Sequence, residues 1–233
     1  MLVGAVLAED GISLNLYKGR FMNLVGITLV FTSWVYTVGL VFILSYFIGS
    51  IPTGYWLVKA KTGQDLRTIG SGSTGATNVK RVLGARYFFA VLILDALKGI
   101  LPVVLAIKYV DFKTELGLIA VVAALGAIVG HSKSIFLSFK GGKSVATGIG
   151  TILALNWQVG LILAAIWGGI TYFSKYVSLG SVIALACAPI LMILFKQPIA
   201  YTLYCLAGAI YIIYLHRENI NRLLQGNENK VRK

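Results

Sequence analysis

Long apolar segments separated by short polar ones dominate this chain. They run near 35–58, 87–107, 116–137, 145–155, 159–173, 177–195 and 199–215. A helix rises about 1.5 Å per residue, so about 20 apolar residues cross the hydrocarbon core of a membrane. The pattern therefore predicts an all-α, polytopic integral membrane protein. The segment 145–155 is short for a crossing, and an alternative is one span with 159–173, broken at Asn156-Trp157-Gln158.

The positions of the cations decide between seven crossings and six. With seven, one face receives the loops 59–86, 131–144 and 174–176 and the tail 216–233, which hold most of the 21 Lys and Arg residues. Basic loops favour the cytoplasmic side. A six-crossing arrangement would divide these loops between the two faces. We therefore expect about seven transmembrane helices, with the N-terminus outside and the C-terminus in the cytoplasm.

The same pattern divides the chain into three parts. We expect an N-terminal extension over 1–33, a membrane-embedded domain over 34–216 and a cytoplasmic basic tail over 217–233. The apolar stretch 21–33 fits either an interfacial helix or an extension of the first span. The opening MLVGAVLAED lacks a basic stretch before its short apolar run, so we do not expect a cleaved signal peptide.

Composition narrows the possible partners. The chain of 233 residues is 58% hydrophobic and only 12% charged, with a formal charge of +13. Soluble domains carry about 25% charged residues, so the lipid bilayer is the expected environment. In a membrane protein a positive charge is typical of cytoplasmic loops, and we expect no nucleic-acid partner. Cys187 and Cys205 lie in apolar runs, which suits packing better than a disulfide or a metal site.

The stretch GSGSTGATNVKR, residues 70–81, stands out against its apolar flanks. Its glycines let backbone N–H groups approach an anion, and a helix beginning near Ala76 would add its positive end. The G-x-G-x-x-G spacing has no buried strand before it, so a dinucleotide site is not expected. A flexible loop is the simpler alternative. The candidate anion ligands are Ser71, Gly72, Ser73, Thr74, Gly75, Thr77, Asn78, Lys80 and Arg81.

A second glycine and lysine cluster, FKGGKSVAT, precedes the apolar segment 145–155. Leu137 stands where a P-loop needs its first glycine, so that motif is absent. The candidate phosphate ligands are Lys140, Gly141, Gly142 and Lys143. Lysines flanking a span are the ordinary alternative. His131, at the preceding membrane boundary, suits phosphate binding, proton transfer or a purely structural role.

A third cluster follows the last span, where His216 and Asn219 share one helical face and Glu218 and Arg222 another. A solvated tail is its alternative. Within the span 87–107, Asp95 and Lys98 are three residues apart, and such a pair is either structural or functional.

Several common catalytic and metal-binding motifs do not occur in the sequence, and this narrows the possible chemistry. There is no Gly-x-Ser-x-Gly motif and no metal-ligand spacing, so we expect neither a metal nor a cofactor. Neither histidine is followed by the Asp found in many membrane acyltransferases, because Phe136 and Asn221 occupy those positions. A site with phosphate ligands and few bases suits a substrate that brings its own leaving group.

With these clusters in family order, the chain resembles the bacterial acyl-phosphate:glycerol-3-phosphate acyltransferases (PlsY). The resemblance rests on GSIPTGY, GSGSTGATNVKR, DALKG, GHSKSIFLSFKGGKSVAT and HRENINRLLQG. The family usually has Asn and often Pro at Ser73 and Thr74, Pro at Ser134 and Gly at Ser144. Residues before about 34 look like an extension.

The resemblance implies a function. The family transfers an acyl group from acyl phosphate to the 1-hydroxyl of glycerol 3-phosphate, giving lysophosphatidic acid and phosphate. It implies a bacterial inner membrane location with a cytoplasmic active site, and a soluble acyltransferase as supplier of acyl phosphate. The implied catalytic residues are Ser71, Arg81 and Lys143, and the implied substrate ligands include His216 and Asn219. A transporter of a phosphorylated solute is the alternative, since basic glycine-rich loops also suit anion carriers.

Overall fold

The computed structural model describes residues 2–110 and 117–231, with side chains from residue 26 onward. All of the regular secondary structure in those residues is helical, which confirms the predicted all-α class. The chain forms two compact units, Met1–Leu40 and Val41–Lys233. Residues 2–50 are one helix, α1 (Leu2–Ser50), so the stretch 21–33 continues into the first apolar segment. In the first unit, the apolar side chains of Ile27, Phe31 and Tyr36 are exposed.

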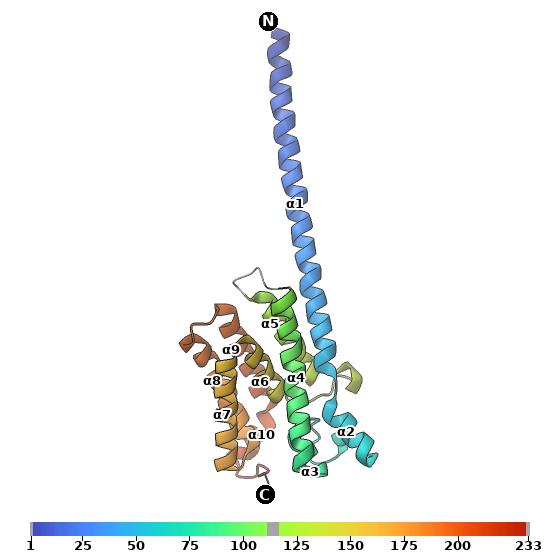
Figure 1. The fold of residues 1–233 in the computed structure, drawn as a ribbon, viewed down its shortest axis with the longest axis vertical. Coiled ribbons are helices and arrows are strands. Elements are labelled where there is room, and N and C mark those ends of the chain that lie inside the picture. Colours follow the sequence, from blue (N-terminus) through green and yellow to red (C-terminus); the bar gives the residue numbers. More distant parts are fainter. Residues whose placement is uncertain (1, 111–116, 232–233) are drawn as a thin grey trace. The chain divides into compact units, whose positions relative to one another are not determined.

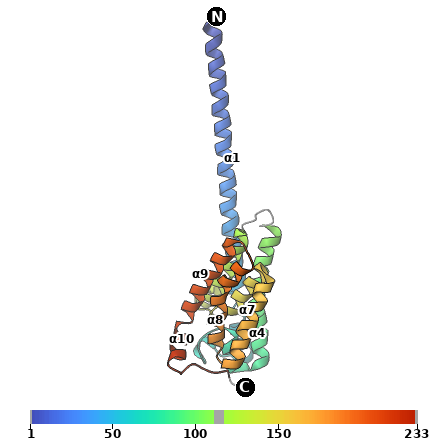
Figure 2. The same cartoon turned by 90° about the vertical axis from the view of Figure 1, so that its left-hand side faces the viewer.

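The second unit contains the remaining helices (Figure 1). These are α2 (Thr53–Thr62), α3 (Ala76–Leu83), α4 (Ala85–Tyr109), α5 (Leu118–Ser132), α6 (Val145–Leu155), α7 (Trp157–Ser174), α8 (Val177–Leu194), α9 (Ile199–Leu215) and α10 (Arg217–Leu224). Helices α7, α8 and α9 lie side by side (Figure 2).

Two breaks divide apolar segments. The predicted span 35–58 is interrupted at Ile51 and Pro52, between α1 and α2. Proline has no N–H to continue a helical ladder, so the helix ends before it. The expected break after residue 155 is confirmed, because α6 ends at Leu155 and α7 begins at Trp157. Asn156 caps α7 by accepting a hydrogen bond from the N–H of Val159 at 2.9 Å.

The candidate crossings are fewer than the seven apolar segments. Among the described residues, five helices are long and apolar enough to cross a membrane, and a sixth arises if α9 and α10, bent by 62°, form one span. Helix α6, with 11 residues, is too short to qualify alone. A multi-pass helical protein is therefore established, whereas seven crossings stays a prediction.

Glycines bring the helices at the centre of the second unit into backbone contact. A Cβ at Gly99 of α4 would overlap the carbonyl of Thr147, and one at Gly150 of α6 would overlap that of Ala96. Small residues at such crossings let membrane helices associate through close packing. The backbones of α4 and α6 therefore lie in close contact, and this contact fixes the position of one helix against the other.

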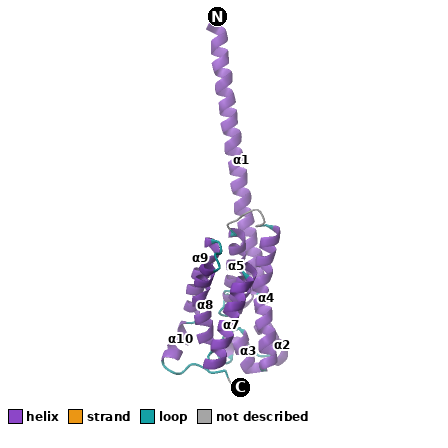
Figure 3. Cartoon of the chain, turned by 60° about the vertical axis from the view of Figure 1, so that its left-hand side comes forward, coloured by secondary structure: helices purple, strands orange, loops and turns teal. Residues whose placement is uncertain are grey.

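Helices α2, α3 and α10 and the C-terminal segment lie at one end of the second unit (Figure 3). This end collects the three polar clusters found in the sequence. The loop 70–75 precedes α3, the glycine and lysine loop 140–143 precedes α6, and α10 carries the third cluster.

Candidate active site

The loop 70–75 is held in shape by the side chain of Asn78. Its Oδ1 accepts a hydrogen bond from the N–H of Ser71 at 3.0 Å. Its Nδ2 donates to the carbonyls of Leu66, Ile69 and Ser73 at 3.2, 2.9 and 2.9 Å. Asn78 is only 1% exposed, so its side-chain polar atoms form their hydrogen bonds within the protein and not with solvent. Asn78 therefore shapes the loop from beneath.

Glycine is required in this loop for conformational reasons. Gly72 has a φ of +66°, a left-handed conformation that other residues adopt at a cost. Helix α3 begins at Ala76, as the sequence predicts, and Gly75 is its N-cap residue. The loop thus leads directly into a helix whose positive end supports an anion.

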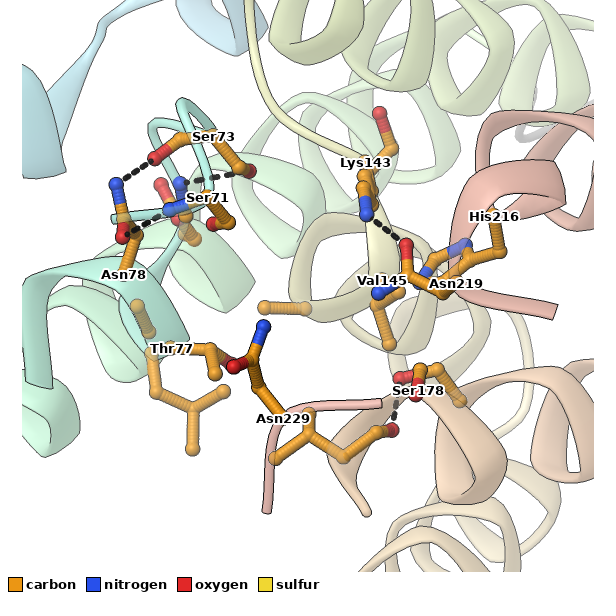
Figure 4. A pocket seen from close by; sticks show the side chains of 18 of the residues that line it. Ser71, Ser73, Thr77, Asn78, Lys143, Val145, Ser178, His216, Asn219 and Asn229 are labelled. Carbon is orange, nitrogen blue, oxygen red and sulfur yellow. Dashed lines mark hydrogen bonds between the residues drawn. The ribbon is translucent and has the colours of Figure 1, made fainter. Parts of the chain in front are cut away.

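The opposite wall is formed by the loop 140–143 and by α10. Two backbone hydrogen bonds fasten the loop to the end of α5, from Gly141 N–H to the Ser132 carbonyl at 3.0 Å and from Gly142 N–H to the His131 carbonyl at 3.1 Å. Next to it, Nζ of Lys143 donates a hydrogen bond to Oδ1 of Asn219. Figure 4 shows Ser71 and Asn78 on one side of the pocket, with Lys143 and Asn219 on the other.

His216 lies buried at the junction of α9 and α10. Its Nδ1 is 2.8 Å from the carbonyl of Ile212. A carbonyl only accepts, so Nδ1 must carry a proton, and in the neutral ring Nε2 is then the acceptor. His216 and Asn219 both line the pocket, as their shared helical face predicts.

The tail segment 227–231 folds back to the site and supplies a carboxylate. Glu228 accepts hydrogen bonds from Asn219 Nδ2 at 2.7 Å, Ser178 Oγ at 2.9 Å and Arg222 Nε at 2.7 Å. The N–H of Val231 donates to the carbonyl of Lys175 at 2.8 Å, which fastens the segment to the α7–α8 turn. Arg222 therefore pairs with Glu228, and its predicted helical neighbour Glu218 is not its partner.

Burial and neighbouring groups shift the pKa values of the ionisable side chains in this wall. Burial lowers the pKa of Lys143 below its ordinary 10.5, as do Arg222 and Arg81, while Glu228 and Glu218 act in the opposite direction. For Glu228, burial raises the pKa, but hydrogen bonds from Asn219, Arg222 and Ser178 outweigh it and leave the pKa below 4.5. Glu228 is thus an ionised partner for the cations.

All of the predicted catalytic and substrate-binding residues line two adjacent hollows in the described chain, whereas Thr74 and Lys80, two of the candidate anion ligands, line neither. The deeper hollow is lined by Ser71, Gly75, Thr77, Asn78, Arg81, His131, Lys143, His216 and Asn219. The shallower one, which shares Ser71 and Lys143, adds Gly72, Lys140, Gly141 and Gly142. Three stretches far apart in the sequence therefore converge.

Sequence reasoning missed several residues of the deeper hollow. They are Phe88, Leu92, Trp167, Val177, Ser178, Ser181, Glu228 and Asn229. The apolar members give the pocket a hydrophobic side next to its cations. Such a pocket suits a molecule with an anionic head and an apolar chain.

Comparison with known proteins identifies the family. The sequence model described as "Glycerol-3-phosphate acyltransferase" matches residues 39–226. A glycerol-3-phosphate acyltransferase of Trichormus variabilis is 44% identical over 211 residues, covering 85% of this chain and 93% of the relative. One from Fusobacterium nucleatum is 45% identical over 188 residues, covering 81% and 95%. This chain belongs to the glycerol-3-phosphate acyltransferase family.

Solved structures agree with this assignment. PlsY, an integral membrane glycerol 3-phosphate acyltransferase, in its glycerol 3-phosphate form has a TM-score of 0.78 and 38% identity, with 84% of this chain and 96% of that one covered. Its lysophosphatidic acid form has a TM-score of 0.75 and 36% identity, with coverages of 84% and 95%. The chain described here is therefore a multi-pass membrane acyltransferase of the PlsY family.

Proposed function

We propose that this enzyme transfers a fatty acyl group from acyl phosphate to the 1-hydroxyl of glycerol 3-phosphate. The products are lysophosphatidic acid and inorganic phosphate. The observation that carries the proposal is the pocket itself. Serine and arginine on the α3 side, and lysine, histidine and asparagine on the α10 side, line one hollow, and an apolar flank adjoins them. Two phosphate-bearing substrates, one with an acyl chain, match this division.

The reaction needs no covalent acyl-enzyme intermediate. The substrate hydroxyl oxygen attacks the acyl carbon, the bond from that carbon to the bridging phosphate oxygen breaks, and phosphate leaves. A phosphate oxygen of a substrate accepts the hydroxyl proton, which suits a pocket poor in strong bases. Ser71, Arg81 and Lys143 bind phosphate and stabilise developing charge. His216 and Asn219 orient the acceptor, with His216 Nε2 available to accept from a glycerol hydroxyl.

The remaining ligands hold the phosphates by backbone and charge. Gly72, Gly75, Gly141 and Gly142 allow close approach of an anion, and Thr77, Lys140 and His131 complete the two walls. Asn78 contributes through the loop that it shapes. The site needs neither a metal nor a cofactor for this chemistry.

The charge pattern supports a particular arrangement in the membrane. We place the enzyme in the bacterial inner membrane with seven crossings, the N-terminus outside and the site at the cytoplasmic face, because α2, α3 and α10 carry basic residues at one end. The soluble acyltransferase that forms acyl phosphate is the expected partner at this face. Residues 1–33 are an extension, 34–216 the membrane-embedded acyltransferase domain and 217–233 the cytoplasmic tail, which supplies Asn219 and Glu228 to the site. Deleting residues 2–33 should therefore leave transfer intact.

The test uses protein purified in detergent with palmitoyl phosphate and glycerol 3-phosphate. Phosphate and lysophosphatidic acid should form in equal amounts, and Ser71→Ala should lose both products. Ser138→Ala is the matched control, because Ser138 is an exposed serine that lines neither hollow. Phosphate without lysolipid would mean hydrolysis only. Proteoliposomes that move labelled glycerol 3-phosphate without an acyl donor would favour a transporter instead.

A further inference from the structure

A buried polar cluster joins four helices beside the pocket. Its members are Thr53 of α2, Asp95 and Lys98 of α4, His131 of α5 and Thr147 of α6. All except Thr53 are buried, and Asp95 and His131 line the deeper hollow. The proposed reaction gives Asp95, Lys98 and Thr147 no part. Polar groups inside a membrane protein are costly unless they are satisfied, so this arrangement requires an explanation.

The charges of the cluster are balanced. Asp95 Oδ1 accepts hydrogen bonds from Lys98 Nζ at 2.8 Å and from Thr53 Oγ1 at 2.6 Å. Lys98 also donates to the carbonyl of Ile51 at 2.8 Å, in the break between α1 and α2. The ion pair therefore fastens that break to α4, and both charges can stay buried.

The hydroxyl of Thr147 fixes the direction of the next hydrogen bonds. Thr147 Oγ1 donates to the backbone carbonyl of Asp95 at 2.9 Å, and it lies 3.1 Å from Nδ1 of His131. A hydroxyl has one hydrogen, and the carbonyl can only accept. Nδ1 of His131 must therefore be the donor to Thr147. The carboxylate of Asp95, whose Oδ1 is 3.8 Å from the same nitrogen, also favours a proton there.

This tautomer leaves Nε2 of His131 without a hydrogen, and Nε2 faces Gly142. A Cβ added at Gly142 would overlap Nε2, so the ring packs directly on that glycine. The His131 carbonyl accepts the N–H of Gly142 at 3.1 Å. The opposite tautomer would point an N–H at a CH2 group that cannot accept it, and would push the loop away. Lys143 is the next residue along the chain.

We propose that Asp95 and Thr147 are positioning residues that hold His131 as the Nδ1–H tautomer, with Nε2 packed on Gly142, and thereby fix the loop that presents Lys143. The ion pair with Lys98 keeps Asp95 in place. Asp95 and Thr147 thus act on the reaction through His131 and the loop 140–143, without touching substrate themselves. Its effect on activity rests on the proposed function, whereas its effect on the histidine ring does not.

The histidine ring gives a direct readout. The chain has only two histidines, so protein grown with 15N-histidine gives two ring signal sets, and His216→Gln identifies the one from His131. We expect His131 to show a protonated Nδ1 and an unprotonated Nε2. Thr147→Ser should keep this pattern and Thr147→Val should change it. A wild-type His131 that is protonated at Nε2, or one unchanged by Thr147→Val, would overturn the proposal.

Thr151→Val is the matched control. Thr151 is one turn further along α6, equally buried, and its hydroxyl bonds Tyr204 of α9 and the carbonyl of Gly148. This variant should lower the melting temperature without moving the His131 signals or the KM for glycerol 3-phosphate. Equal shifts from Thr147→Val and Thr151→Val would mean general loosening of α6, and the proposal would be wrong.

Kinetics separate this proposal from the proposed function. Thr147→Val should lower kcat/KM by about 10-fold, the size of one lost buried hydrogen bond, and Thr147→Ser by much less. In the Lys143→Ala background Thr147→Val should add little, since both act through one loop. Full activity of Lys143→Ala would refute the site. A Lys143→Ala variant with strongly reduced but measurable activity, on which the effect of Thr147→Val is fully additive, would refute only the positioning role.

Discussion

Lys143 donates a hydrogen bond to Oδ1 of Asn219, although the two residues are 76 positions apart. Asn219 in turn donates to Glu228. The amide thus links the cation of the glycine loop to the carboxylate of the tail. This chain of contacts makes the position and the charge of Lys143 depend on residues that lie outside its own loop.

The rate should fall on the alkaline side as Lys143 loses its proton. Burial lowers the pKa of this group, so the fall should occur below pH 10.5. Asn219→Asp places a carboxylate beside the ammonium and raises its pKa, which should move the fall to higher pH. Initial rates of lysophosphatidic acid formation across the pH range, corrected for spontaneous hydrolysis of acyl phosphate, measure this shift. An alkaline limb at the same pH in both proteins would contradict it.

Asn78→Ala should destabilise the loop 70–75. The substitution removes the acceptor of the Ser71 N–H and the donor to three carbonyls. At about 1 kcal/mol for each net hydrogen bond, the expected loss is about 2–4 kcal/mol. Thermal unfolding in detergent tests the stability, and kcat/KM should fall as well. Thr68→Ala removes one hydrogen bond of an exposed side chain, at 2.8 Å, and should have a small effect.

Ser144 has a φ of +60°, in the left-handed region that favours glycine. Its Oγ donates to the carbonyl of Ile128 at 2.9 Å, which offsets the strain of that conformation. Ser144→Gly should change stability little, because it removes about 1 kcal/mol of strain and one hydrogen bond together. Ser144→Ala keeps the strain and loses the bond, so it should be less stable than either. Unfolding curves that rank alanine above glycine would show that the strain is not significant.

Glu228→Ala should disrupt the α10 wall. It removes the acceptor shared by Asn219, Ser178 and Arg222, so kcat/KM should fall by about 10-fold or more. Glu228→Gln keeps one oxygen for Asn219 and Ser178 but loses the charge facing Arg222, and should be intermediate. Lys230→Ala is the control, because its exposed side chain lies outside both hollows. Equal activities of the alanine and glutamine variants would argue against the hydrogen bonds to Oε1.

Sequence reasoning found the site residues that lie in polar segments of this otherwise apolar chain. Gly72, Lys143 and Asn219 lie in polar, glycine-rich or charged clusters next to spans, and such clusters must meet at the membrane surface. The number of crossings was harder to predict, since α6 is short and α9 bends into α10. Apolar length alone does not say whether such a helix completes a crossing.

Ser178 and Glu228 could not be found in this way. A serine in an apolar helix and a glutamate in a basic tail are ordinary residues in their local contexts. Their place in the site depends on the chain turning back after α10, where the N–H of Asn227 donates to the carbonyl of Arg222 at 2.8 Å. Helical spacing placed Glu218 and Arg222 on one face, and both line the shallower hollow, but it could not show that Arg222 forms its ion pair with Glu228 beyond the end of the helix.

The return of the tail segment 227–231 has a practical consequence for protein engineering. The matched family region ends at residue 226, yet the carboxylate that holds Asn219 comes two residues later. An affinity tag fused after residue 233 would be separated from Glu228 by only five residues, so its bulk and charge would bear on the candidate site. Tags and fluorescent fusions therefore belong at the opposite terminus, and an inactive preparation with a C-terminal tag says little about the enzyme itself.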